Sequence, residues 1–151
     1  MSGVKPIPEG YHSVTPHLAI RGAAQALAFY ARAFGAEELF RMPGPGDTVM
    51  HAEMRIGDSR VMVGEECPEM GASAPQTLGG SAVSLLLYVC DVDAACARAA
   101  GAGCTVEQPP TDMFWGDRYA KLQDPFGHKW GIATHKEDVS PDEIARRLAA
   151  G

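Results

Sequence analysis

The chain has 151 residues, the length of one domain or of two small repeats that share a core, and its 46% hydrophobic content is enough to fill that core. Its formal net charge of −6 argues against the basic surface that nucleic-acid-binding proteins generally present, and no apolar stretch approaches the ~20 residues that cross a bilayer. The first residues also lack the apolar core of a signal peptide, so we expect a cytoplasmic protein with no nucleic acid or membrane partner.

A strand, a helix and three further strands are predicted in the first half of the chain. Residues 14–20 alternate between apolar and polar side chains, which predicts a strand. Residues 23–34 carry apolar side chains at helical spacing, and Gly35 is placed to end that helix. The remaining alternating segments predict strands over residues 37–42, 49–56 and 60–65.

Residues 66–80 are rich in Gly, Pro and Ser, which predicts a linker long enough to act as a lid over a cleft. The same order of elements then returns, with Asp91 as the N-cap of a second helix and Gly101 at its end. The elements of this second repeat are a strand over residues 81–89, a helix over 92–100, a loop over 108–113, and strands over 105–107, 117–123 and 129–134.

The repeat predicts an α+β fold, in which two βαβββ units form a curved mixed sheet with a concave cleft. A capping box at Ser140, followed by Pro141, adds a C-terminal helix. Because the repeats present two similar strand faces, the space between them is the expected place for a ligand. We expect a single domain over residues 1–151, made of repeats over roughly 14–65 and 81–135 and a helix over 140–150.

Three short motifs mark the first helix, the entry to the second helix and the turn before the last strand. They are Phe29-Tyr30 with Phe34-Gly35-Ala36, Val89-Cys90-Asp91-Val92-Asp93, and Asp124-Pro125-Phe126-Gly127-His128. With these motifs in this order and spacing, the chain resembles the vicinal oxygen chelate superfamily of glyoxalases, bleomycin-resistance proteins and dioxygenases over residues 14–135. Residues 113–118 and the tail around Pro141 resemble the PhnB-like branch of that superfamily.

For the metal-dependent members, the resemblance implies a divalent ion held by His and Glu side chains on the first and last strands of each half. In the second half, the corresponding positions hold Ser84 and Gly131. In the first half they hold Met62 and either Thr15 or His17. A hard divalent ion favours several oxygen or imidazole ligands, whereas Met is a soft thioether and Gly has no side chain. We therefore expect no metal and no other cofactor.

A rearranged metal site is the alternative. His51 and Glu53 share one strand face and could hold an ion or act on a substrate together with His17, although the same pattern is typical of a solvated outer face. Glu65 and His135 are further candidates, each equally compatible with a surface position. In this alternative the protein is a divalent-metal-dependent lyase, isomerase, transferase or dioxygenase.

Five of the eleven aromatic residues lie close together in the second repeat: Phe114, Trp115, Tyr119, Phe126 and Trp130. Aromatic side chains give large, rigid contact areas for planar ligands, although Phe126 and Trp130 also fit a core. The resemblance supplies a precedent, because bleomycin-resistance proteins bind a bulky aromatic drug in grooves at a dimer interface without catalysis.

Our first hypothesis is therefore a metal-free homodimer, with no catalytic residue, that sequesters a bulky aromatic or cationic compound such as an antibiotic. A small interaction or regulatory module without a pocket ligand is a further alternative. The candidate ligand-binding residues are His17, His51, Met62, Ser84, Phe114, Trp115, Tyr119 and Trp130.

Overall fold

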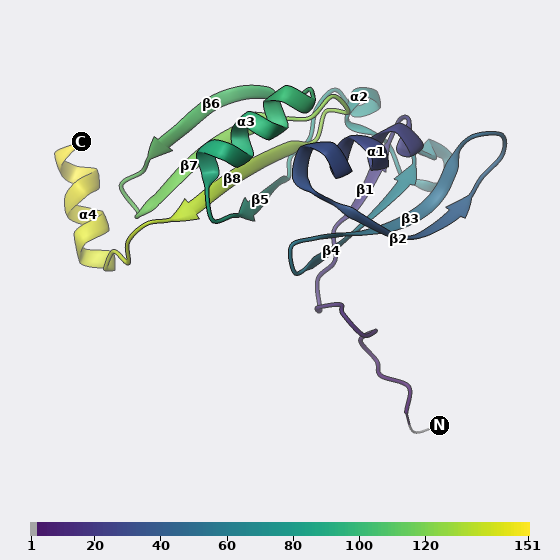
Figure 1. Ribbon diagram of the computed structural model, residues 1–151, viewed down its shortest axis with the longest axis horizontal. Coiled ribbons are helices and arrows are strands. Elements are labelled where there is room, and N and C mark those ends of the chain that lie inside the picture. Colours follow the sequence, from purple (N-terminus) through teal and green to yellow (C-terminus); the bar gives the residue numbers. More distant parts are fainter. Residues whose placement is uncertain (1–2) are drawn as a thin grey trace. The chain divides into compact units, whose positions relative to one another are not determined.

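The protein is described over residues 3–151 by a computed structural model, in which the chain divides after Gly80 into two compact units (Figure 1). The predicted α+β fold is confirmed, because each unit contains one βαβββ repeat with a four-stranded mixed sheet. That the two repeats share one core and face a common cleft stays a prediction.

In unit 1, one helix covers one face of the sheet (Figure 1). The strand order is β1-β4-β3-β2, with β1 parallel to β4 and the other pairs antiparallel. The core contains Ile20, Met54 and Val63 from the strands and Tyr30 from the helix, each at most 1% exposed. The elements are β1 (His17–Ile20), α1 (Ala23–Phe34), β2 (Glu37–Pro43), β3 (Val49–Ile56) and β4 (Ser59–Glu65).

The opposite face of this sheet is the one on which the candidate residues lie. Successive strand residues point to opposite faces, so His17 lies on the face away from the buried Leu18. The strand register then places Met62 beside His17 on one side and beside Glu53 on the other. The three side chains therefore form a row across β1, β4 and β3.

Residues 66–80 are not the open linker that their composition predicts. They form a short 3₁₀ turn (Pro68–Met70) and one helical turn, α2 (Pro75–Leu78). The carboxylate of Glu66 accepts hydrogen bonds from Thr77 Oγ1, Ala74 N and Arg21 Nε, and these bonds lower its pKa to about 2. This carboxylate holds the segment together and ties it to Arg21, just before α1.

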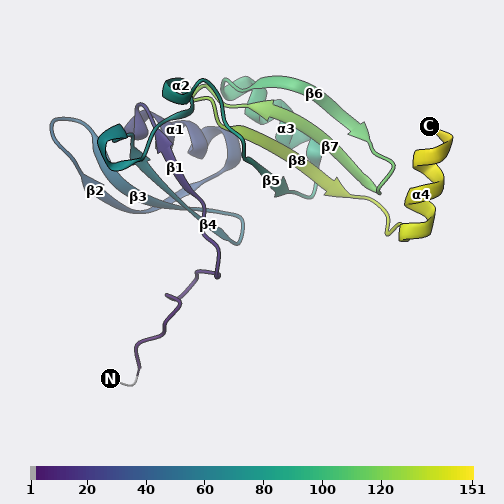
Figure 2. The ribbon, with the colours of Figure 1, turned by 180° about the vertical axis from the view of Figure 1, so that it is seen from behind.

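Unit 2 repeats the arrangement, with strand order β5-β8-β7-β6 and α3 against one face of the sheet. Figure 2 shows these strands in front of α3, so that the open face of the sheet is toward the viewer. Val92, Leu122 and Ile132 are at most 1% exposed and form its core. The elements are β5 (Ser84–Tyr88), α3 (Val92–Ala102), β6 (Thr105–Asp112), β7 (Asp117–Gln123), β8 (Lys129–His135) and α4 (Pro141–Ala150).

Three predicted boundaries in unit 2 are wrong. Strand β5 covers Ser84–Tyr88 rather than residues 81–89. The helix α3 continues to Ala102 and is closed by Gly103, at φ 131°, rather than by Gly101. Strand β6 runs through Pro109-Pro110, where a loop was expected, because it is the edge strand of the sheet and its register with β7 shifts at the prolines. The predicted stop at Gly35 and the predicted N-cap at Asp91 are confirmed.

The C-terminal helix α4 begins as predicted, with Ser140 Oγ accepting a hydrogen bond from Glu143 N. Its side chains are exposed or half-buried, and Leu148 is 60% exposed. Arg147 holds the helix to the rest of unit 2 by donating to Glu137 and to the carbonyl oxygen of Phe114. Within residues 3–151, no helix is both long enough and apolar enough to cross a bilayer.

The turn before β8 is organised by Asp124, which is only 3% exposed. Its Oδ1 accepts hydrogen bonds from the backbone N–H groups of Phe126 and His128, at 2.9 and 3.0 Å, and its Oδ2 accepts one from Trp130 Nε1 at 2.9 Å. Trp130 is itself 4% exposed. The motif Asp-Pro-Phe-Gly-His is therefore a structural turn that holds the indole of Trp130 in the core.

We predict that Asp124→Ala lowers the free energy of unfolding by about 3 kcal/mol, because three donors, one of them a buried indole, lose a charged acceptor. Urea unfolding followed by circular dichroism measures this loss. Asp91→Ala is the control, since it removes one exposed helix cap and costs about 1 kcal/mol. Equal losses in the two variants would contradict the structural role given to Asp124.

Candidate functional site

The open face of unit 1 gathers two histidines and a carboxylate. The rings of His17 and His51 meet edge to face with centroids 5.5 Å apart, and His51 Nε2 lies 3.4 Å from Glu53 Oε2. The side chains of His51 and Glu53 are 25% and 26% exposed, so they are half-buried on this face. The hydroxyl of Tyr11 donates a hydrogen bond to Glu53 Oε1 from the N-terminal arm, by which we mean residues 3–16 before β1.

The electrostatics of this face fix two protonation states. Burial, together with the hydrogen bond to Glu53, raises the pKa of Tyr11 to about 12, so the phenol keeps its proton and acts as a donor at neutral pH. Burial, together with the neighbouring His51, lowers the pKa of His17, so its imidazole is neutral at neutral pH.

A cavity of about 370 Å³ lies between the N-terminal arm and strands β3 and β4 of unit 1. The arm contributes Ile7, Pro8 and Tyr11 to its walls, and the sheet contributes Glu53 and Met62. One candidate residue, Met62, thus faces a real cavity. The sequence alone does not single out Tyr11, since nothing in its neighbourhood predicts its hydrogen bond to Glu53.

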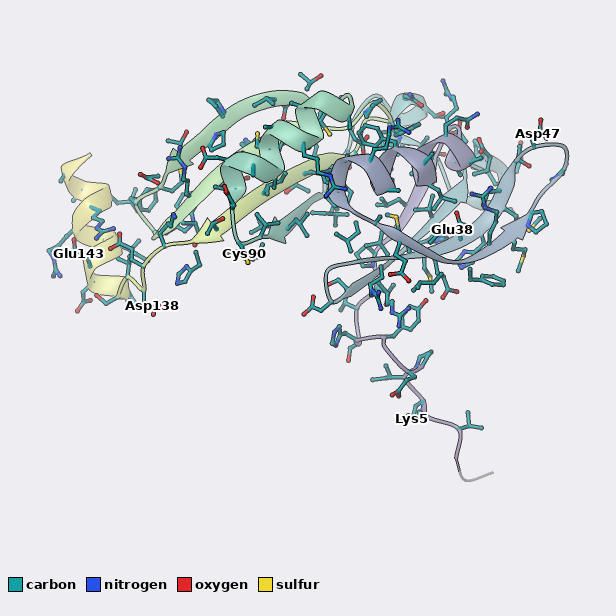
Figure 3. All side chains as sticks on the ribbon, viewed as in Figure 1. Lys5, Glu38, Asp47, Cys90, Asp138 and Glu143 are labelled. Atoms are coloured by element: carbon teal, nitrogen blue, oxygen red, sulfur yellow. The ribbon has the colours of Figure 1, made fainter. Side chains whose placement is uncertain are left out.

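The open face of unit 2 is organised by Asp117, whose carboxylate is buried at 4% exposure. Its Oδ2 accepts hydrogen bonds from the Tyr88 hydroxyl at 2.7 Å and from Trp115 Nε1 at 3.2 Å. Its Oδ1 lies 2.7 Å from His135 Nδ1, and His135 Nε2 lies 2.7 Å from an oxygen of Asp138. Figure 3 labels Asp138 in the segment between β8 and α4.

These bonds shift the pKa values of the network. Burial would raise the pKa of Asp117, but hydrogen bonds from His135, Tyr88 and Trp115 outweigh it and hold the pKa below its usual value. Hydrogen bonds to Asp117 and Asp138 raise the pKa of His135, and the bond to Asp117 raises that of Tyr88. The network therefore favours an ionised Asp117 that is surrounded by donors.

Aromatic side chains line the same face. The ring centroids of Phe114 and Trp115 are 5.1 Å apart and those of Trp115 and Tyr119 are 5.9 Å apart, both edge to face. The ring of Tyr119 lies over Gly131, where a Cβ atom would come within 2.8 Å of Tyr119 Cε1 and 3.0 Å of Leu86 Cδ1. We call this surface the aromatic face and define it as Leu86, Tyr88, Phe114, Trp115 and Tyr119.

Strand alternation places two other candidate positions. Ser84 is exposed on β5, opposite Lys129 and on the same face as Leu86. Trp130, expected to contact a ligand, instead lies in the core with its indole on Asp124. Strand alternation explains this position, because Gly131 points to the open face and its neighbour must point the other way.

Glu65, a candidate in the rearranged metal site, has a structural role. Its two carboxylate oxygens accept hydrogen bonds from the backbone N–H groups of Gly22 and Ala23, each at 3.0 Å. It therefore caps the N-terminus of α1, where Gly22 itself has no side chain to do so. Glu65 is therefore half-buried at this cap, a role that neither the metal-site nor the surface interpretation predicted.

The residues at the implied metal positions do not fit a divalent ion. The Gly131 position is filled by the ring of Tyr119, and the Met62 position offers only a thioether. Across residues 3–151, no three His, Cys, Asp or Glu side chains converge in a way that could hold a metal ion. The row of His17, His51 and Glu53 is not such a group.

We predict that Gly131→Ala displaces the Tyr119 ring and lowers the free energy of unfolding by about 1–2 kcal/mol, the usual cost of overpacking. Near-ultraviolet circular dichroism reports the ring, and urea unfolding reports the stability. Gly101→Ala is the matched control, because it lies in α3 with open space out to 4 Å in the described chain, and it should stabilise by about 0.5–1 kcal/mol. A loss in the control, or none in Gly131→Ala, would contradict the packing.

We predict that His135→Asn removes a pH-dependent contribution to stability. The folded-state pKa of His135 lies above its unfolded value of about 6.5, so this contribution is complete below pH 6.5 and is lost as pH rises through the folded pKa. The difference in unfolding free energy between the wild type and this variant should therefore shrink from pH 6 to pH 8. His12→Asn, which removes an exposed imidazole in unit 1, is the control. A difference that grows over this range would oppose the assignment.

Comparison with known proteins places this geometry in a family. The sequence profile of the Glyoxalase/Bleomycin resistance protein/Dioxygenase superfamily matches residues 11–132. The uncharacterized protein Mb0911c of Mycobacterium bovis is 43% identical over 141 residues, which cover 91% of this chain and 93% of that protein.

Solved structures give the same result. TioX from Micromonospora sp. ML1 is 29% identical with a TM-score of 0.67, over 82% of this chain and 98% of that one. TnmS3, an antibiotic binding protein from Streptomyces sp. CB03234, is 24% identical with a TM-score of 0.62, over 88% of this chain and 100% of that one, and shows the fold alone. The chain therefore belongs to the glyoxalase/bleomycin resistance protein/dioxygenase superfamily.

Proposed function

We propose that the protein binds a planar aromatic small molecule, such as an aromatic antibiotic, without a metal ion, and that the aromatic face of unit 2 is its binding surface. One observation carries this proposal. At Gly131, where the superfamily resemblance implies a metal-ligating Glu, the space is filled by the ring of Tyr119. A side chain that would bind a metal ion is therefore replaced by an aromatic ring, against which a planar ligand can stack.

The aromatic face has the properties of a binding surface. Leu86 and Tyr88 are 49% and 58% exposed, so both offer apolar surface that a ligand can cover. Trp115 is held in one orientation because its indole N–H is bonded to the buried Asp117. A ligand therefore meets rings that have already lost their rotational freedom, which lowers the entropic cost of binding.

The comparisons support a binding role at the level of the fold. TnmS3, whose fold this chain shares, is an antibiotic binding protein. The proposal includes a homodimer in the cytoplasm, as the resemblance to bleomycin-resistance proteins implies, and membership of the PhnB-like branch. The metal-dependent alternative gains no support from the residues at the implied ligand positions.

We predict that protein purified without chelator contains well under one divalent ion per chain, because the implied ligand positions hold Gly131, Met62 and Ser84. Elemental analysis by mass spectrometry measures the content, and a chelator-treated sample is the control. A stoichiometric ion that chelator removes would overturn the metal-free part of the proposal.

We predict that planar aromatic antibiotics quench tryptophan fluorescence on binding, and that Tyr119→Ala and Trp115→Leu each weaken binding about tenfold. The basis is that one stacking contact contributes about 1–2 kcal/mol. The matched control is Phe40→Ala, which removes a 47% exposed aromatic ring from β2 in unit 1. Since Trp115→Leu removes one fluorophore, affinities are measured for every variant by calorimetry as well. Equal losses in the control, or none in Tyr119→Ala, would exclude the aromatic face as the site.

A further inference from the structure

The last residues of unit 2 contact the turn that carries two rings of the aromatic face. We propose that residues 136–151, which we call the C-terminal latch, control this turn: docked, the latch holds Phe114 and Trp115 in the position that binds a ligand, and undocked it releases them. The inference rests on the proposed function, because it concerns how the same surface is regulated. Figures 1 and 2 show α4 beside the end of the β6–β7 hairpin, where this turn lies.

The latch holds the turn by the carbonyl oxygens on either side of Trp115. Arg147 Nη1, on α4, donates a hydrogen bond to the carbonyl oxygen of Phe114 at 3.1 Å. The carbonyl oxygen of Gly116 accepts hydrogen bonds from two backbone N–H groups at the start of the latch, at 2.9 and 3.1 Å. Because the residue between these two carbonyls is Trp115, the latch fixes the backbone that carries the indole.

The latch and the turn also fit closely against each other. Gly116 is buried and has a φ of +110°, in the left-handed region. A Cβ atom on this residue would lie 2.3 Å from the carbonyl oxygen of Glu137 and 3.0 Å from Val139 Cγ2. The latch therefore occupies the space that a side chain would need, and a shift of the latch is transmitted to the turn.

The attachment of α4 is polar and exposed, so it can open. None of residues 141–150, all of which the structure describes, is buried. Arg147 lies 2.7 Å from Glu137 and 3.1 Å from Glu143, and these three side chains are between 33% and 53% exposed. Ion pairs this exposed contribute little to stability and are screened by salt. Docking is therefore reversible, and high salt shifts the latch toward its undocked state.

Undocking should weaken binding at the aromatic face. The indole N–H of Trp115 keeps its acceptor, Asp117, but the backbone on both sides of the indole loses its hydrogen bonds to the latch. A ligand must then order the turn as it binds, which lowers its affinity. Salt does not screen the contacts of an uncharged ligand with aromatic rings, so a loss of affinity in salt reports the latch.

The test compares two neighbouring arginines on α4. Arg147→Gln removes the bond to the Phe114 carbonyl oxygen and the pair with Glu137. Arg146→Gln is the matched control, because Arg146 pairs with Glu143 on the same helix (Figure 3) and its removal leaves Arg147 in place. Both variants lose the same charge, so a difference between them reports the contact with the turn.

Hydrogen exchange measured by NMR reads the turn without a ligand. We expect Arg147→Gln to speed exchange of the Trp115 indole N–H and of the Gly116 amide about threefold or more, since the turn opens more often. The indole N–H of Trp130, which is bonded to Asp124 in the core, is the internal reference and should be unchanged. Salt raised from about 50 mM to about 500 mM should speed the same exchange in the wild type, which tests the latch even if a variant fails to fold.

Calorimetry at pH 7 with 1-naphthol, an uncharged planar probe, then measures the effect on binding. Over the same salt range, the affinities of the wild type and of Arg146→Gln should fall about threefold, the size of an exposed ion-pair effect. Arg147→Gln should bind about threefold more weakly in low salt and lose little further affinity as salt is added.

Unchanged exchange in Arg147→Gln, or an equal change in Arg146→Gln, would overturn the inference. Binding of 1-naphthol that is as tight in Arg147→Gln as in the wild type would overturn it as well. The proposed function fails separately: if the wild type binds neither 1-naphthol nor an aromatic antibiotic while exchange responds as expected, the aromatic face is not the ligand site, whereas the latch is supported.

Discussion

The buried carboxylate of Asp117 is the interaction on which unit 2 depends. A carboxylate that loses its water costs several kcal/mol unless donors replace the lost hydrogen bonds, so its neighbours are constrained to supply them. The three donors come from β5, from the turn between β6 and β7, and from β8. One group thereby joins three segments that are distant in sequence, fixes the Trp115 ring, and through it positions Tyr119 over Gly131.

The two repeats keep the same frame and differ on their open faces. In both repeats, the face of the sheet that packs against the helix is apolar and buried. The order of the four strands is the same, and so is the parallel or antiparallel direction of each strand pair. The open face of unit 1 is polar, with Glu53 available beside a cavity. The open face of unit 2 is aromatic, and its carboxylate is enclosed. Because residues on the open face are not required for the core, they can change chemically while the fold is retained.

Local signals in the sequence were enough to predict the framework. Gly35 and Asp91 act on the turn in which they stand, so their roles could be predicted from residue type and spacing. The second helix was placed correctly but ended too early, since Gly101 and Gly103 are both glycines and only backbone conformation decides between them. Strand β6 was predicted too short, because Pro109 and Pro110 are tolerated only in an edge strand. Which strand lies at the edge depends on the strand order of the sheet.

The site was harder to predict for the same reason. Phe114, Trp115 and Tyr119 could be grouped in advance because they are close in sequence, and their rings do lie together. Tyr88 and Asp117 were missed, since their contact depends on how β5, β8 and β7 are ordered and aligned. Trp130 was kept both as a candidate ligand contact and as a core residue, and alternation with Gly131 places it in the core.

The cap of α1 has a consequence for the order in which the repeats fold. The side chain that satisfies its first N–H groups is Glu65, which lies 42 residues along the chain at the end of β4. The start of α3 instead has Asp91 three residues from its partner Ala94. The first turn of α1 therefore gains its hydrogen-bond acceptor only after β4 has reached α1, which closes a loop of the whole first repeat. The first turn of α3 has its acceptor, Asp91, within the same turn and can form without closing a long loop. We expect helix formation to be an early event in the second repeat and a late one in the first.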